Sequence, residues 1–426
     1  MISRRYIVME PVDHSTALFY KMSKENNGNT LFVLAELDGN PSERYIVNHI
    51  ENIITCFPIL SKILIEHDQG FEWKNHTITD ICDHFTYIEK QRYDKRNFHR
   101  YINALIEKDF AEGQPEWEFS LLTYEKSNKT FLIFKSNHIY GDGHQISHYL
   151  KLFMDNPEIK YPKIKKRTYS LFNKVYAFLM TWIQLIYVLL FFRRKDISFD
   201  KKGAHLDKAR FLHCHTWSLE EVRKIKEYYG VSINDLYFTI ITQAIREYCG
   251  KDISLSSLSM FNLRNLSSFS PNKENTAKEQ NNIGFISLSK KITEDTTNNL
   301  LNNSTTLSYF KSSPFIYCIV EGVKYISKFS STLSLSFLRY LGGQSTFGFS
   351  NFRAFSEEKS MNGCRVTNIS NFVVPYRVGS LFTLVSYCDN ITLNVTFRER
   401  NITDQKKFLK CIDDVYCQLK DKAIGW

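Results

Sequence analysis

Three residues between Phe131 and Leu150 have types and a spacing that suit chemistry at a turn. His138 follows an apolar, β-branched and aromatic run, and Asp142 and Gly143 come four and five residues later. Apolar side chains then recur at helical spacing, so the pattern predicts a strand, a tight loop and a helix. A histidine titrates near neutral pH and can take a proton from a hydroxyl, which makes His138 a candidate general base.

Length and composition limit the kind of fold that can contain this loop. A chain of 426 residues with 43% hydrophobic and 15% aromatic content predicts a globular protein of two α/β domains. We expect an N-terminal domain at 1–156, a basic and hydrophobic crossover at 157–210 and a C-terminal domain at 211–426. The net charge of +10 favours an acidic surface or an anionic ligand. Dispersed basic residues without a nucleic-acid-binding motif argue against nucleic acid.

Neither cysteines nor histidines form a metal-binding pattern. The nine cysteines include no C-x-x-C and indicate reduced thiols in a cytosol-facing protein. His144 and His148 stand four apart on a predicted helix, a spacing that can bind zinc, but no third ligand is evident. We therefore predict no metal and no bound cofactor.

Hydrophobic periodicity and turn residues predict elements in both domains. Ser42 and Ser232 are candidate N-caps, and Ser218-Leu-Glu-Glu221 is a candidate capping box. The predicted helices are 15–22, 42–55, 98–110, 218–229, 233–248, 403–423 and most of 293–326. The predicted strands are 30–37, a hairpin within 63–73, a second hairpin of 117–124 and 129–136, and 253–263, 284–288, 381–387 and 391–398.

The segment 171–192 is long and apolar enough to cross a bilayer and is flanked by basic residues. Asn173, Ala177, Thr181 and Gln184 fall along one face at helical spacing, which also suits a buried crossover helix or an interfacial anchor. A single crossing would place the two domains on opposite sides of a membrane. We therefore favour attachment to one face.

Further motifs accompany the histidine loop in a fixed order. They are Pro115-Glu116-Trp117, Asn234-Asp235, Asn262-Leu-Arg264, Asn282-Ile-Gly-Phe285, Ser350-Asn351 and Ser386-Tyr387. Together they resemble the wax ester synthase/diacylglycerol acyltransferase family, which is grouped with condensation domains and plant BAHD acyltransferases. The resemblance covers nearly the whole chain. It departs where the family has a paired histidine, here Asn137-His138. The family's P-L-W appears here as Pro115-Glu116-Trp117.

The resemblance implies two layered α/β domains, like those of condensation domains and chloramphenicol acetyltransferase, with an active-site tunnel at their interface. It implies acyl transfer from acyl-CoA, as co-substrate, to a fatty alcohol or diacylglycerol, and a cytosol-facing place on a membrane such as the endoplasmic reticulum. His138 would be the base, Asp142 a structural residue paired with Arg264, and Gly143 the start of the following helix. The substrate-binding residues implied are Asn137, Trp117, Asn234, Ser350 and Asn351.

Two alternatives stay open. Asn137 in place of the first histidine allows a lipid-binding protein on the same fold with impaired catalysis. An acyltransferase that uses a different alcohol or an amine fits the same residues. The sequence does not fix the acyl-chain length or the oligomeric state.

Overall fold

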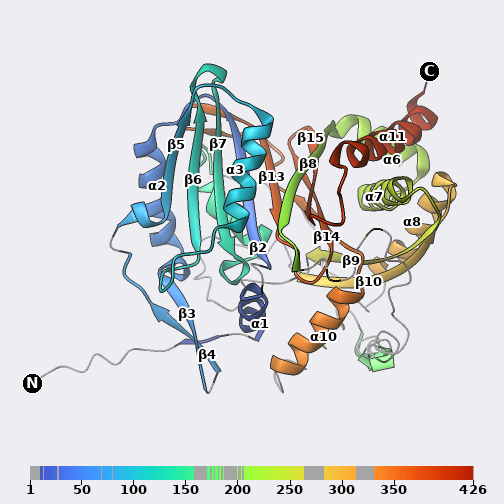
Figure 1. The fold of residues 1–426 in the computed structure, drawn as a ribbon, viewed down its shortest axis with the longest axis horizontal. Helices are drawn as coiled ribbons and strands as arrows, with labels where there is room; N and C mark the ends of the chain where they lie inside the picture. Colours follow the sequence, from blue (N-terminus) through green and yellow to red (C-terminus); the bar gives the residue numbers. More distant parts are fainter. Residues whose placement is uncertain are drawn as a thin grey trace, which may run out of the picture.

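The structure is a computed structural model. It describes residues 10–12, 14–25, 28–68, 70–78, 80–157, 206–262, 283–312 and 331–425, together with isolated positions between 170 and 203. Two six-stranded sheets lie side by side and a small three-stranded sheet lies below the first of them (Figure 1). The architecture is therefore mixed α/β with two sheet-rich domains, as predicted.

The first large sheet contains the strand that leads to the histidine loop. Its order is β12-β13-β2-β7-β6-β5. The strands are β2 (Thr30–Asp38), β5 (Phe85–Lys90), β6 (Trp117–Tyr124), β7 (Lys129–Asn137), β12 (Ser360–Met361) and β13 (Cys364–Val373). β2 and β7 are antiparallel with Thr30 opposite Asn137, so the beginning of β2 lies beside the end of β7.

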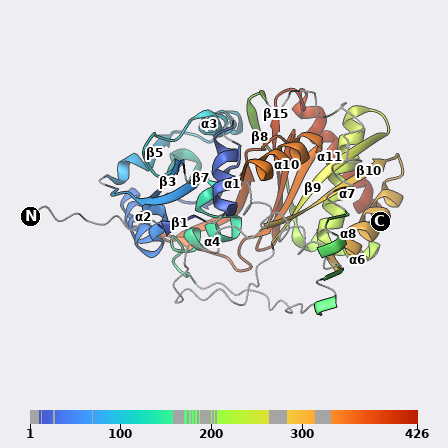
Figure 2. The same ribbon diagram turned by 90° about the horizontal axis from the view of Figure 1, so that it is seen from below.

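Helices cover both faces of this sheet. Helix α2 (Glu43–Cys56) and helix α4 (Gly143–Lys151) pack in one core, and α3 (Lys95–Glu107) packs in a second core on the other face. Helix α1 (His14–Ser23) lies below, beside α10 (Ser331–Gln344), as both views show (Figures 1 and 2). The small sheet consists of β1 (Glu10–Pro11), β4 (Gly70–Asn75) and β3 (Lys62–His67). Short 3-10 helices are η1 (Pro58–Ser61), η2 (Ile81–Asp83), η3 (Glu125–Ser127) and η4 (His138–Tyr140).

The second large sheet has the order β10-β9-β11-β14-β15-β8. The strands are β8 (Ala209–Ser218), β9 (Ile253–Asn262), β10 (Ile283–Ile292), β11 (Phe347–Arg353), β14 (Ser380–Tyr387) and β15 (Asn390–Arg398). Its outer face packs on α6 (Leu219–Tyr229), α7 (Ile233–Cys249), α8 (Thr296–Ser312) and α11 (Gln405–Ile424) (Figure 2). Every residue of α7 from Asp235 to Ile245 is buried, as expected of a helix at the centre of a core.

Strands β12 and β13 lie late in the chain but belong to the first sheet. β13 pairs antiparallel with β2 from Arg365 opposite Asp38 to Val373 opposite Leu31. Hydroxyls of the second sheet also bind β13, since Thr383 Oγ1 donates to the carbonyl of Asn371 at 2.6 Å. The two sheets are thus joined by a strand that the sequence did not assign. The domain boundaries near 156 and 210 stay a prediction.

Most predicted helices and strands are present with ends shifted by a few residues. Ser42 caps α2, and Ser232 and Asp235 form a capping box on α7. One detail of the prediction was wrong, because Ser218 precedes α6 but its side chain makes no capping hydrogen bond. The strands β1, β5, β8 and β11 to β13 and the helix α10 were not predicted.

Much of the apolar segment 171–192 lies outside the described residues. In the part of the chain that the structure does describe, no helix is long and apolar enough to cross a membrane. Met180 is half-buried, and the other described apolar side chains of this segment are exposed, namely Leu171, Phe172, Val175, Tyr176, Phe178, Leu179, Trp182, Ile183 and Ile186. The exposure of these side chains does not fit the alternative of a buried crossover helix.

The two serine caps provide a matched stability test. Ser232 Oγ accepts from the backbone N–H of Asp235, and the Asp235 carboxylate accepts from that of Ser232. We expect Ser232→Ala to lower the free energy of unfolding by about 1 kcal/mol. Ser218→Ala, at a cap without such a bond, should change it by at most a few tenths of a kcal/mol. Urea unfolding measures both, and equal losses would show that the capping box contributes nothing.

Candidate active site

The predicted strand, loop and helix are formed at the end of β7. Asn137 ends the strand and caps η4, because its Oδ1 accepts from the N–H of Ile139 at 3.1 Å. Gly141 then takes φ +141°, a conformation that side chains rarely adopt, and α4 begins two residues later. The chain therefore reverses direction within a few residues, and His138 lies at the start of this turn.

Two buried tyrosines fix the shape of this loop. The hydroxyl of Tyr140 donates to the carbonyl of Lys62 at 2.8 Å and accepts from the N–H of Glu116 at 3.1 Å. The hydroxyl of Tyr149 donates to the carbonyl of Tyr140 at 2.7 Å. Because burial raises the pKa of Tyr140 well above its usual value, this phenol stays a neutral donor. The loop is held as a rigid unit.

The imidazole of His138 is 6% exposed and stacks on the ring of Phe19 in α1. The ring centroids are 4.6 Å apart and the planes differ by 9°. An apolar ring against one face of the imidazole fixes its plane and keeps water from that side. The geometry suits a base whose direction of proton transfer is set before substrate binds.

Helix α1 is held in this position by an ion cluster at its C-terminal end. The carboxylate of Glu25 binds the guanidinium groups of Arg339 and Arg377 and accepts from the hydroxyl of Tyr376 at 3.2 Å. Burial alone would raise the pKa of Glu25, but the two arginines outweigh it and the pKa is lowered. Glu25 is therefore ionised at neutral pH and ties α1 to α10 and to the segment after β13.

Asn137 takes part in a polar network beneath the loop. Its buried Nδ2 donates to Ser23 Oγ at 2.8 Å and to the carboxylate of Glu116. Glu116 in turn pairs with Lys24 at 2.7 Å. Burial lowers the pKa of Lys24, but the carboxylate of Glu116 outweighs that effect and the pKa is raised. The two departures from the family motifs, Asn137 and Glu116, are hydrogen-bonded to each other.

Asp142 acts as the N-cap of α4. It is 3% exposed, its Oδ1 accepts from the N–H of Gln145 at 3.1 Å, and its carbonyl accepts from that of Ile146. This is the structural kind of role expected for it. Its predicted partner Arg264 lies outside the described residues, so that ion pair stays a prediction.

Gly143 lies where strands of the later half of the chain reach the loop. A Cβ at this position would lie 3.3 Å from Nδ2 of Asn371 and 3.8 Å from the ring of Phe352. Phe352 stands two residues after Ser350 on β11, so both side chains leave the same face of that strand. The structure therefore places Ser350 on the face of β11 that meets the histidine loop.

Two other predicted residues meet each other on the opposite face of β11. Asn351 Nδ2 donates to Oδ1 of Asn234, which stands in the first turn of α7. Asn351 is exposed and Asn234 is half-buried. Their predicted substrate-binding role stays a prediction.

Trp117 has the contacts of a core residue. It is 1% exposed, its indole N–H donates to the carbonyl of Leu60 at 2.8 Å, and its ring stacks on His84 with centroids 4.3 Å apart. Nothing in these contacts requires a ligand. Its role in substrate binding stays a prediction.

Residues that the sequence analysis missed lie mainly on α1. Phe19 and Ser23 contact the loop from more than 110 positions away, and no local motif marks them. Glu116 was visible as a departure from P-L-W, but only the fold shows that it faces Asn137. Within the described residues, no three or more histidine, cysteine, aspartate or glutamate side chains gather to hold a metal ion.

Comparisons with known proteins agree with this architecture. Residues 280–420 match the family model of the WS/DGAT C-terminal domain. A protein of Arabidopsis thaliana, wax ester synthase/diacylglycerol acyltransferase 2, is 24% identical over an alignment 430 residues long, and the match covers 86% of this chain and 86% of that protein. The predicted resemblance to the wax ester synthase/diacylglycerol acyltransferase family is therefore confirmed, and with it the assignment as an acyltransferase.

Solved structures share the fold at low sequence identity. The wax ester synthase/diacylglycerol acyltransferase from Marinobacter aquaeolei VT8 has a TM-score of 0.63 and 17% identity, and covers 97% of this chain and 100% of its own. The first condensation domain of the calcium-dependent antibiotic synthetase has a TM-score of 0.62 and 10% identity, covering 98% and 96%. The predicted condensation-domain-like fold is confirmed.

The contact between Asn137 and Glu116 predicts energetic coupling. We expect Glu116→Leu to lower the free energy of unfolding by about 1–3 kcal/mol, because it strands a buried amide N–H. The double variant Asn137→His, Glu116→Leu restores both family motifs and should lose less than the sum of the single variants, by about 0.5–3 kcal/mol. Urea unfolding of the four proteins measures the coupling. Lys24→Met, which removes the outer ion pair and the contact of the ammonium with the ring of Tyr20, is the control and should cost at most about 1 kcal/mol. Strict additivity would show that the two positions are independent.

Proposed function

We propose that this acyltransferase moves a long-chain acyl group from acyl-CoA to the hydroxyl of a fatty alcohol or diacylglycerol, giving a wax ester or a triacylglycerol. The observation that carries the proposal is the buried imidazole of His138, fixed at the end of β7 by the stack on Phe19. This placement, together with the family assignment, supports His138 as the general base.

The reaction needs one base and a place for developing negative charge. The acceptor hydroxyl attacks the thioester carbonyl while His138 takes its proton, and a tetrahedral oxyanion forms. The carbon–sulfur bond then breaks, and the imidazolium returns the proton to the CoA thiolate. The helix that starts at Gly143 presents backbone N–H groups beside the loop, and such a terminus favours negative charge.

The other site residues serve this chemistry by support and substrate contact. Asp142 keeps α4 capped, and Asn137 keeps the loop joined to α1 and β6. Ser350, Asn234 and Asn351 are proposed to contact the substrates from β11 and α7. The net charge of +10 suits the phosphates of acyl-CoA, which is proposed as co-substrate without any bound cofactor.

Loss of the base tests the catalytic proposal. With radiolabelled palmitoyl-CoA and hexadecanol or diacylglycerol, His138→Ala should lower the rate of ester formation by about 10²–10⁴-fold. His67→Ala, at an exposed histidine of the small sheet, should keep the wild-type rate. Thermal unfolding of both variants separates lost folding from lost chemistry. Full activity of His138→Ala would contradict the assigned base.

A second candidate is a lipid-binding protein with impaired catalysis, which the asparagine at position 137 motivates. The amide of Asn137 is fully used in holding Ser23, Glu116 and Ile139, so the substitution leaves no unsatisfied group behind. This observation favours the active enzyme. Absence of ester from a panel of alcohols and amines, with acyl-CoA binding retained, would instead support the second candidate.

We further propose that the segment 171–192 attaches the protein to the cytosol-facing surface of a membrane, such as the endoplasmic reticulum, where lipid acceptors are found. Its described apolar side chains other than Met180 are exposed, with Leu171 at 79% and Phe172 at 77%. Basic residues flank the segment in the sequence and suit anionic lipid headgroups. A single crossing would place the two halves of one active site on opposite sides of the membrane, so the proposal is for interfacial attachment.

Polar substitutions in this segment test the attachment. Leu179 and Ile183 are 56% and 58% exposed, and replacing both by serine should weaken binding to phosphatidylcholine–phosphatidylserine vesicles by about tenfold or more. Leu301→Ser with Tyr309→Ser, on the exposed face of α8, is the matched control and should bind as wild type. Vesicle flotation measures the bound fraction. Equal binding by both variants would place the membrane contact elsewhere.

A further inference from the structure

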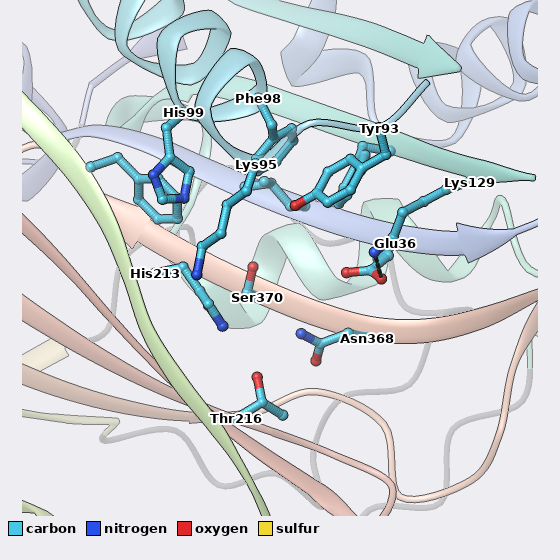
Figure 3. A pocket seen from close by; sticks show the side chains of 13 residues that line it. Glu36, Tyr93, Lys95, Phe98, His99, Lys129, His213, Thr216, Asn368 and Ser370 are labelled. Carbon is cyan, nitrogen blue, oxygen red and sulfur yellow. Dashed lines mark ion pairs between the residues drawn. The ribbon is translucent and has the colours of Figure 1, made fainter. Parts of the chain in front are cut away.

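A cavity of about 240 Å³ lies between α3 and β8, over β2 and β13 (Figure 3). Its lining residues are Leu34, Glu36, Tyr93, Lys95, Phe98, His99, Lys129, Phe131, Phe211, His213, Thr216, Asn368 and Ser370. His138 is not among them. It stands seven residues beyond Phe131 along β7, roughly 20 Å away at the rise of a strand. The cavity is therefore distinct from the candidate active site.

The inner wall of the cavity is apolar and aromatic. Leu34, Phe98, Phe131 and Phe211 are all buried, and Phe98 and Phe131 pack with ring centroids 4.3 Å apart. Tyr93 lies at the side with its hydroxyl directed into the cavity (Figure 3). Such a wall binds a flat apolar body by burial and ring stacking.

The charges around the rim leave one cation uncompensated. Lys129 pairs with Glu36 at 2.6 Å and lies over the ring of Tyr93, so this pair is neutral overall. Lys95 extends from the first turn of α3 into the cavity toward His213 and Ser370 (Figure 3). Among the residues that the structure describes, no carboxylate lies within ion-pair distance of Lys95.

The two histidines add no charge at neutral pH. Burial and, to a smaller extent, the nearby ammonium of Lys95 lower the pKa of His99 to about 4. Burial also lowers the pKa of His213, whose Nδ1 lies 3.0 Å from Oδ1 of Asn394. Near pH 7 the site therefore carries a net charge of one from Lys95, with the hydroxyl of Ser370 beside it.

We propose that this cavity is a binding site for a small aromatic monocarboxylate, with Lys95 as its counter-ion. The aromatic wall selects a flat apolar body. Lys95 is exposed at the rim of the cavity, where its ammonium can pair with the single negative charge of the ligand. The volume of the cavity lies just below the range of about 300–1,000 Å³ that is typical of pockets for drug-sized ligands, so the ligand has at most one or two rings. The ligand bridges α3 and β8, and so links elements of the two domains.

Isothermal titration with 2-naphthoate tests the site. We expect one site with a Kd of about 0.1–1 mM at pH 7, and no binding of 2-naphthol or 2-naphthylmethylamine, which share the rings but lack the negative charge. Lys95→Met should weaken 2-naphthoate binding by at least about tenfold. Lys126→Met, at an exposed lysine in η3, should leave it unchanged.

Two further variants test whether the ligand binds in this cavity or in the active site. Ser370→Leu, which fills the cavity, should abolish binding, and His138→Ala should bind as wild type because the active site does not contribute. Binding that survives both Lys95→Met and Ser370→Leu would overturn the proposal, as would equal binding of the naphthol. Binding that is lost in His138→Ala would assign the ligand to the active site instead.

Discussion

The side-chain amide of Asn137 is the contact on which the candidate active site depends. It is buried. Its Nδ2 donates to Ser23 on α1 and to Glu116 before β6, and its Oδ1 accepts from the backbone of η4. An unpaired amide group in such a place costs about 1–3 kcal/mol, so these partners hold one another in register. The direction of the His138 ring follows from this arrangement, because α1 also carries Phe19.

Local pattern was enough to predict the strand, turn and helix around His138, since their signals lie within twenty residues. It was also enough for three of the six strands of the first large sheet, for four of the six strands of the second, and for the cap at Ser232. It failed at Ser218, where the capping-box residues are present but the side-chain bond is not formed. Whether a cap forms depends on the path by which the chain enters the helix, and here β8 leads directly into α6.

Contacts between distant segments were beyond the reach of local pattern. Strand β13 alternates polar and apolar residues, and nothing within it shows that its partner is β2, more than 300 positions earlier. The sequence shows Asn137 only as a departure from the family's paired histidine, and only the fold shows that Glu116 lies beside it. The cavity near Lys95 is likewise assembled from five separate stretches of chain, so its residues share no motif. Which distant segments contact each other is determined by the packing of the whole core, and not by the spacing of residues along the sequence.

The crossing of β13 also has a consequence for biosynthesis. Strand β2 is apolar along nearly its whole length, and its edge stays unpaired until residue 373 has been made. An open apolar edge of nine residues is a template for pairing with other chains. The nascent N-terminal half therefore exposes this edge during most of translation. Fragments that end before β13 should for the same reason aggregate instead of behaving as an independent domain.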